Sequence, residues 1–228
     1  MGNKRTGFKF GLGDLIWLLS IAFIALLLII PATHEIFITN TKHHPYIMGF
    51  IKVSILATMG ELLALRIVTN EWKKTSGMLY RAVVWGLIGM TFVVIFDIFF
   101  SGVTGAVAKH LLPGNPDSKL LIAFLTSSFM NLAFAPTFMA FHRVTDTFID
   151  MGEGKLSKIF SIKLADVVGK IDWKGFISFV VCKTIPFFWI PAHTITFMLP
   201  TEYRVLMAAF LSIALGGILA FAKKSKKV

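Results

Sequence analysis

Residues Trp173 to Phe221 read WKGFISFVVCKTIPFFWIPAHTITFMLPTEYRVLMAAFLSIALGGILAF, and this stretch decides the fold. It contains two apolar segments, each about as long as the helix that crosses a bilayer, joined by a short LPTE turn. The first segment carries Lys183, Pro186, Pro191 and His193 inside its apolar run. Two spans connected this closely predict a membrane hairpin. The rest of the chain is expected either to support this hairpin or to form its counterpart.

The composition of the whole chain indicates a membrane protein. Hydrophobic residues make up 56% of the 228 residues and charged residues only 15%, whereas about a quarter of a soluble domain is charged. The net charge of +11 lies mostly between apolar segments, where it favours anionic lipid headgroups. Without an aromatic and basic binding motif, nucleic acid is not predicted as a partner. The single cysteine, Cys182, excludes an internal disulfide and a cysteine-cluster metal site.

Apolar runs predict an all-α, polytopic integral membrane protein, with one membrane domain over residues 1–228. We expect six transmembrane helices at residues 15–31, 46–68, 82–107, 120–141, 176–198 and 203–221. Residues 155–170 place apolar side chains on one helical face and lysines around the others, which predicts an amphipathic helix in the headgroup plane. Pro136 lies within the fourth span and predicts a kink there.

The distribution of Lys and Arg predicts the orientation. With both termini in the cytoplasm, seventeen of the 23 basic residues fall on the inner side. Only Lys42, Lys109, Lys119 and Arg204 fall on the outer side, and Lys52 and Lys183 lie within spans. This bias follows the positive-inside rule. We expect a bacterial cytoplasmic membrane, with an organelle membrane as the alternative.

The polar connection at residues 32–45 contains His34, Glu35, His43 and His44. These residues offer metal-ligand atoms, but adjacent histidines rarely chelate one ion and no helical i, i+4 pair is present. A solvated loop is therefore preferred, and no metal or other cofactor is predicted.

Ionisable residues within spans call for partners, because an isolated charge at mid-bilayer costs about 2.5 to 3.5 kcal/mol on insertion scales. Glu61 and Lys183 both lie about 10 Å from the inner ends of their spans, at about 1.5 Å of rise per residue. We expect these two to pair in an inner polar layer. Lys52 and Asp97 are expected to pair in an outer layer, with His193 near them and close to the interface.

Two interpretations of these charges remain open. They can line a polar cavity on a transport path, or they can fix the registry of the helices without transport. Lys52 can also extend its ammonium to the outer surface without a partner.

Short sequence matches suggest an internal repeat. Gly-Phe-Ile opens the second span at residues 49–51 and the fifth at residues 175–177, and Tyr-Arg precedes the third and sixth spans. The two hairpins would have opposite orientations, which is the arrangement in which transporters often place a binding site at the repeat interface. Breaks at Pro186 and Pro191 would then expose backbone carbonyls to the solute.

Several motifs resemble the Mpv-seventeen / peroxisomal membrane protein family of small integral proteins. These are MGELLA at residues 59–64, Arg81 before a Gly-rich helix, Trp173 at the start of the hairpin, PFFWIP at residues 186–191, and Arg204. The chain differs from the family in its six spans, where the family has four, and in lacking the Gly-Pro-x-x-His-x-Trp-Tyr element. The resemblance implies a pore-forming protein or a modulator of organelle solute balance.

The leading hypothesis is a small channel or transporter for a polar solute, including anionic ones, with lipid around it and a homo-oligomer as one arrangement. An assembly or lipid-organising protein without transport is the alternative. A membrane-embedded enzyme is the third, but no Ser/His nucleophile arrangement, HExxH or phosphate-binding glycine loop is present. No enzymatic activity is therefore predicted.

Overall fold

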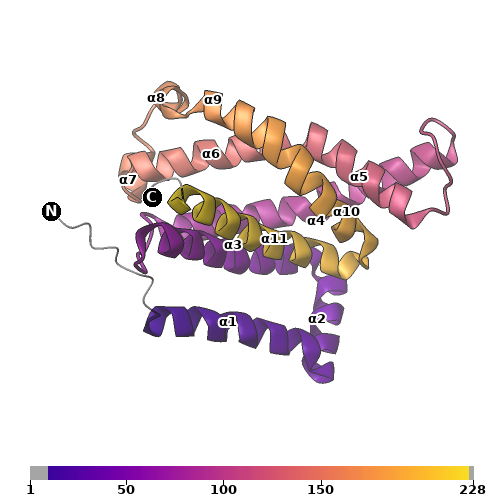
Figure 1. Cartoon of the computed structure of the whole chain (residues 1–228), viewed down its shortest axis with the longest axis horizontal. Helices are drawn as coiled ribbons and strands as arrows, with labels where there is room; N and C mark the ends of the chain where they lie inside the picture. Colours follow the sequence, from indigo (N-terminus) through magenta and orange to yellow (C-terminus); the bar gives the residue numbers. More distant parts are fainter. Residues whose placement is uncertain (1–9, 226–228) are drawn as a thin grey trace.

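The computed structural model describes residues 10–225, and these form a bundle of helices without a strand among them (Figure 1). The helices in chain order are α1 (Leu12–Ile29), α2 (Pro31–His43), α3 (Pro45–Thr69), α4 (Met78–Ala108), α5 (Lys119–Ala133), α6 (Ala135–Met151), α7 (Leu156–Ile159), α8 (Leu164–Lys170), α9 (Trp173–Gly175), the π-helix η1 (Phe176–Trp189), α10 (Ile190–Met198) and α11 (Thr201–Ser225). Lys4, Arg5, Lys9, Lys226 and Lys227, which contribute to the predicted charge asymmetry, lie outside the described residues.

The prediction of an all-α polytopic membrane protein is confirmed. Five helical segments of the described chain are long and apolar enough to cross a membrane, and the pair α5 and α6 forms a sixth if it counts as one span. This pair bends by 45°, and Pro136 lies in the first turn of α6, so the predicted kink is confirmed. We call the end of the bundle with α7 and α8 the α7 end, and the opposite end the α2 end (Figure 1).

Helices α3, α4 and α11 form the centre of the bundle. Val53, Leu56 and Ala57 of α3 are buried in the main apolar core together with Ala209 of α11 and Phe96 of α4. The elements therefore bury one apolar face each and leave the remaining apolar faces to lipid.

A close approach of two glycines sets the crossing of α3 and α4. A Cβ atom on Gly49 would lie 2.7 Å from the carbonyl oxygen of Gly89, and one on Gly89 would lie 2.2 Å from the carbonyl oxygen of Gly49. Only glycine fits at both positions, so the two backbones can come into contact.

Helix α1 runs beside the bundle with most of its surface exposed (Figure 1), and its side-chain hydrogen bonds to the rest of the protein lie in its first two turns. Arg66 of α3 donates two hydrogen bonds of 2.8 Å to the Asp14 carboxylate, which also accepts one of 3.2 Å from the Trp72 indole. Trp17 donates to the backbone carbonyl of Met59 at 3.1 Å. The polar contacts thus fix the α7 end of α1 against α3.

The connection after α1 is a helix, so the predicted loop at residues 32–45 is wrong. Pro31 opens α2 and Pro45 opens α3, each in the first helical turn, where proline costs no backbone hydrogen bond. Helix α2 runs crosswise to α1 at the α2 end of the bundle (Figure 1). It is tied to α11 by a hydrogen bond between His34 and Tyr203 and by an ion pair of 3.5 Å between Lys42 and Glu202.

Two further predictions about secondary structure are wrong. The expected interfacial helix at residues 155–170 is two short helices, α7 and α8, with a turn between them. Pro186 and Pro191 do not break the fifth span, because η1 continues directly into α10. The wide turns of a π-helix form i to i+5 hydrogen bonds, so the segment remains helical around Pro186, and Pro191 lies in the first turn of α10.

Candidate functional site

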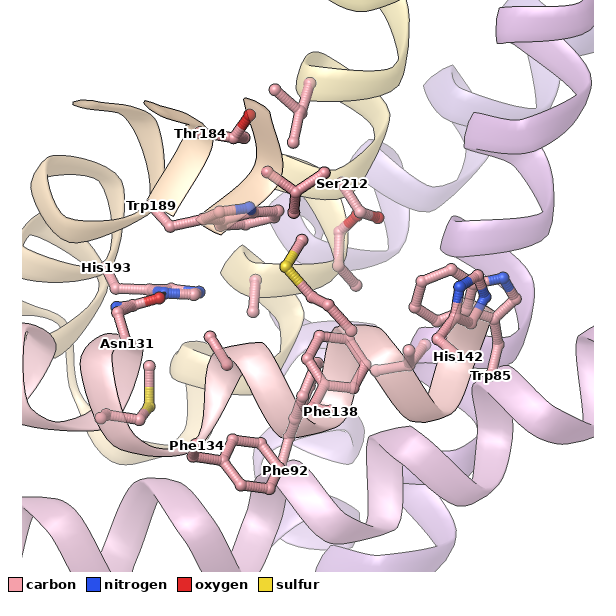
Figure 2. Close-up of a pocket in the computed structure, with 18 of the residues that line it drawn as sticks. Trp85, Phe92, Asn131, Phe134, Phe138, His142, Thr184, Trp189, His193 and Ser212 are labelled. Carbon is pink, nitrogen blue, oxygen red and sulfur yellow. The ribbon is translucent and has the colours of Figure 1, made fainter. Parts of the chain in front are cut away.

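A cavity of about 200 Å³ lies at the centre of the bundle, between α3, α4, α5, α6, η1, α10 and α11 (Figure 2). Most of its wall is apolar or aromatic. Figure 2 shows Phe92, Phe134 and Phe138 on one side and Trp189 on the other. A few polar side chains interrupt this apolar surface, which is the usual composition of a site for a small molecule.

The first polar group in the cavity is the pair Asn131 and His193. The His193 ring nitrogen Nδ1 lies 3.1 Å from the Asn131 amide, and both side chains are buried. The His193 ring also stacks on Trp189, with 5.0 Å between ring centroids. The kink and the π-helix bring these residues together, because Asn131 lies just before the bend and Trp189 ends η1.

Trp189 also presents a buried donor to the cavity. Its indole Nε1 has no hydrogen-bond partner among the described residues, and the ring lines the cavity with Thr184 and Ser212 nearby (Figure 2). A buried donor without a partner costs free energy, and an acceptor on a bound molecule would satisfy it.

His142 and Trp85 lie at the other end of the cavity (Figure 2). The rings of Trp85 and His142 are in contact, with 4.1 Å between centroids. Beyond them lies a charged cluster from α3, α4 and α6, which we call the α7-end cluster: Glu61, Arg81, Trp85, His142, Asp146 and Asp150.

Most polar groups of the α7-end cluster have partners. The Trp85 indole donates to Glu61 Oε1 at 2.7 Å, while Arg81 lies 2.7 Å from Asp146 and 2.5 Å from Asp150. Arg81 Nε also donates to the Ser76 carbonyl. The guanidinium therefore joins the start of α4 to the last two turns of α6.

Glu61, His142 and Asp146 also have the donor types of a divalent-cation site. One ligand atom from each lies within 4.8 Å of the other two. The Arg81 guanidinium already neutralises Asp146, however, and a cation bound there would be repelled by it. The geometry therefore favours an ion-pair network.

A second pocket, of about 220 Å³, lies at the α2 end between α2, α3, α4 and α11. We call it the α2-end pocket. Its ionisable side chains are Lys42, Lys52, Asp97, Glu202 and Arg204. Phe96 is buried and lines both this pocket and the central cavity.

The predicted pair of Glu61 and Lys183 does not form. Lys183 is exposed on η1 and makes no ion pair with any described residue, while Glu61 contacts Trp85. A matching distance from the ends of two spans does not determine which way their side chains point. Lys183 is therefore absent from the cavity wall.

The predicted outer layer is partly correct. Lys52 and Asp97 line the same pocket, but Lys52 hydrogen-bonds the Thr41 hydroxyl and the Glu202 carbonyl. Asp97 is exposed and forms no ion pair within the described chain. His193 does not lie with Lys52 and Asp97, because it lines the central cavity and not the α2-end pocket.

Sequence reasoning missed the partners of Glu61. The predicted fourth span ends at Phe141 and so excludes His142 and Asp146, whereas α6 continues to Met151. Their i, i+4 spacing was the available signal, because it places both side chains on one face of a helix.

Comparison with known proteins identifies no relative. No family model, no curated protein and no solved structure matches the chain.

Proposed function

We propose that this membrane protein is a small channel or transporter whose solute combines a small apolar body with a hydrogen-bonding group. The observation that carries the proposal is that one side chain, Phe96, lines both the α2-end pocket and the central cavity. A rotation of that ring would join the two spaces. The path would then run from the α2-end pocket past Asn131 and His193 to Trp85 and His142.

The chemistry of the wall supports a solute of this class. An apolar body would contact the phenylalanines, and its polar group would accept a hydrogen bond from Trp189 and contact the pair Asn131 and His193. We also propose that the α7 end faces the cytoplasm of a bacterial cell, following the excess of lysine and arginine there. The resemblance to the Mpv-seventeen / peroxisomal membrane protein family agrees with a solute pathway, and no enzymatic step is proposed.

A substitution that fills the cavity tests the proposal. Ser212→Phe should lower solute flux by about tenfold or more, the equivalent of about 1.4 kcal/mol in the barrier, because its ring would fill part of the cavity that Ser212 and Trp189 both line (Figure 2). The measurement is a swelling assay on liposomes, with glycerol, amino acids and short-chain carboxylates as solutes. Ser178→Phe is the matched control, because Ser178 is exposed on η1.

The same assay can overturn the proposal. If liposomes with the wild-type protein admit none of these solutes faster than empty liposomes, or if Ser212→Phe and wild type give equal flux, the central cavity is not a path. Flux that falls equally in Ser178→Phe would indicate a general packing defect and contradict the assignment to the cavity.

The segment of α7 and α8 supports a second candidate, a lipid-organising role. Phe160 is 84% exposed and Leu164 58% exposed, and lysines flank them at 158 and 163. Lys158 also donates a hydrogen bond of 2.6 Å to Glu153, which lies between α6 and α7. This bond and the lysine charge lower the pKa of the Glu153 carboxyl. An apolar surface with flanking cations suits an anionic headgroup layer.

A further inference from the structure

The α2-end pocket contains two buried cations. Lys52 and Arg204 are each only 7% exposed, and both line the pocket. Neither lies within 4.0 Å of a carboxylate of the described residues. An ionised side chain this deeply buried normally has an opposite charge beside it.

The contacts of Lys52 are all with neutral groups. Its ammonium donates to the Thr41 hydroxyl at 2.8 Å and to the Glu202 backbone carbonyl at 3.3 Å. It also lies 4.2 Å from the centre of the Phe37 ring. These contacts hold the charge in place at the edge of the pocket without neutralising it.

Arg204 is held in a similar way. Its guanidinium donates to the carbonyls of Leu199 and Phe197 at 3.1 and 3.3 Å, and it lies 4.0 Å from the centre of the Phe100 ring. The side chain thereby caps the end of α10. Its positive charge remains without a carboxylate in contact.

The two acids of the pocket do not balance the three bases. Glu202 pairs with Lys42 at 3.5 Å, and Asp97 is exposed. Three cations and two carboxylates leave one positive charge over, and the two cations that lack contact with a carboxylate are the buried ones. A group with a single negative charge would neutralise the pocket.

We propose that the α2-end pocket binds a small oxyanion, a carboxylate or phosphate group, between Lys52 and Arg204. Charge-assisted hydrogen bonds to such oxygens are about twice as strong as neutral ones. The pocket volume of about 220 Å³ accommodates several water-sized groups at about 30 Å³ each, and Val93, Phe96 and Val205 give it an apolar wall for a short carbon body. This site does not depend on transport, because it follows from the charges of the pocket alone.

The test measures binding to the purified full-length protein in a neutral detergent. Inorganic phosphate and acetate should raise the thermal unfolding midpoint of the wild type above its value in chloride at equal ionic strength. Lys52→Met should weaken binding of these anions by about tenfold or more, while Lys52→Arg should restore part of it. Lys109→Met is the control, because Lys109 is exposed near the same end.

A second arm distinguishes a free solute from a lipid headgroup as the source of the oxyanion. The protein is placed in nanodiscs of phosphatidylcholine with or without phosphatidylglycerol, and bound lipid is measured by native mass spectrometry. Phosphatidylglycerol retained by wild type and lost in Lys52→Met would assign the headgroup phosphate to the site. If free anions do not stabilise the wild type and Lys52→Met retains as much phosphatidylglycerol as the wild type, the proposal is overturned. The shift in the thermal unfolding midpoint is measured on the wild type, so this part of the test does not depend on whether the variants fold.

Discussion

At the α7 end, Arg81 lies between the carboxylates of Asp146 and Asp150, whereas at the α2 end Lys52 and Arg204 lie against neutral carbonyls and a hydroxyl. Both regions place cations in protected positions beside a cavity. In the first, the chain supplies the counter-charge and joins α4 to α6. In the second, it supplies the cations and leaves a pocket beside them, so the same residue types serve packing at one end and ligand binding at the other.

The strongest test of this comparison is a substitution of Arg81, the cation that is paired with carboxylates at the α7 end. Arg81→Met should lower the free energy of unfolding by about 3 to 5 kcal/mol, because Asp146 would remain in a protected site without its partner. The Arg81 side chain is 9% exposed and that of Asp146 21% exposed, so solvent cannot fully replace the contact. The measurement is denaturant unfolding in detergent, with Lys174→Met as an exposed control near the same end.

A double variant shows whether the loss comes from the uncompensated carboxylate. Arg81→Met combined with Asp146→Leu should recover much of the stability, because replacing both members of a buried pair is often neutral. Asp150 is 65% exposed and can be solvated. If the double variant is as unstable as the single one, the ion pair is not what Arg81 contributes.

The opposite result is expected at the α2 end. In a buffer without phosphate or carboxylates, Lys52→Met should keep the wild-type unfolding free energy or raise it by about 1 kcal/mol. Removing a buried, unneutralised ammonium relieves a cost of several kcal/mol, whereas the Thr41 hydroxyl and the Glu202 carbonyl each lose a hydrogen bond of about 1 kcal/mol. The same unfolding measurement is used, and a loss as large as that of Arg81→Met would mean that Lys52 is structural.

The sequence was sufficient to predict an all-α membrane protein with five or six apolar spans and the bend at Pro136, because both follow from properties that act along one helix. Hydropathy sets which segments enter lipid, and a proline inside a span removes a backbone donor whatever surrounds it. The boundary of α6 could not be found in this way. Hydropathy falls after Phe141, but the helix continues because Arg81 and Glu61 of other helices provide partners for its polar face.

The partners of the charged residues could not be predicted because they depend on rotation about each helix axis. A rise of about 1.5 Å per residue estimates how far a residue lies along an α-helix, and this estimate alone paired Glu61 with Lys183. The direction of a side chain also depends on the turn angle, and η1 has the wider turn of a π-helix over 14 residues. The direction in which Lys183 points from η1 therefore could not be derived from its distance to the end of the span.

The smallest effect is expected for Lys183, the residue that depth alone placed opposite Glu61. Lys183→Ala should leave the free energy of unfolding within about 0.5 kcal/mol of the wild type and leave liposome flux unchanged, because the side chain is exposed and does not line the cavity. Ser212→Phe, measured in the same assay, gives the scale for a blocked path. A fall in flux for Lys183→Ala as large as that for Ser212→Phe would mean that the solute passes along the exposed face of η1 and not through the central cavity. The unpaired cations of the α2-end pocket would then have no part in solute passage, even if they bind an oxyanion.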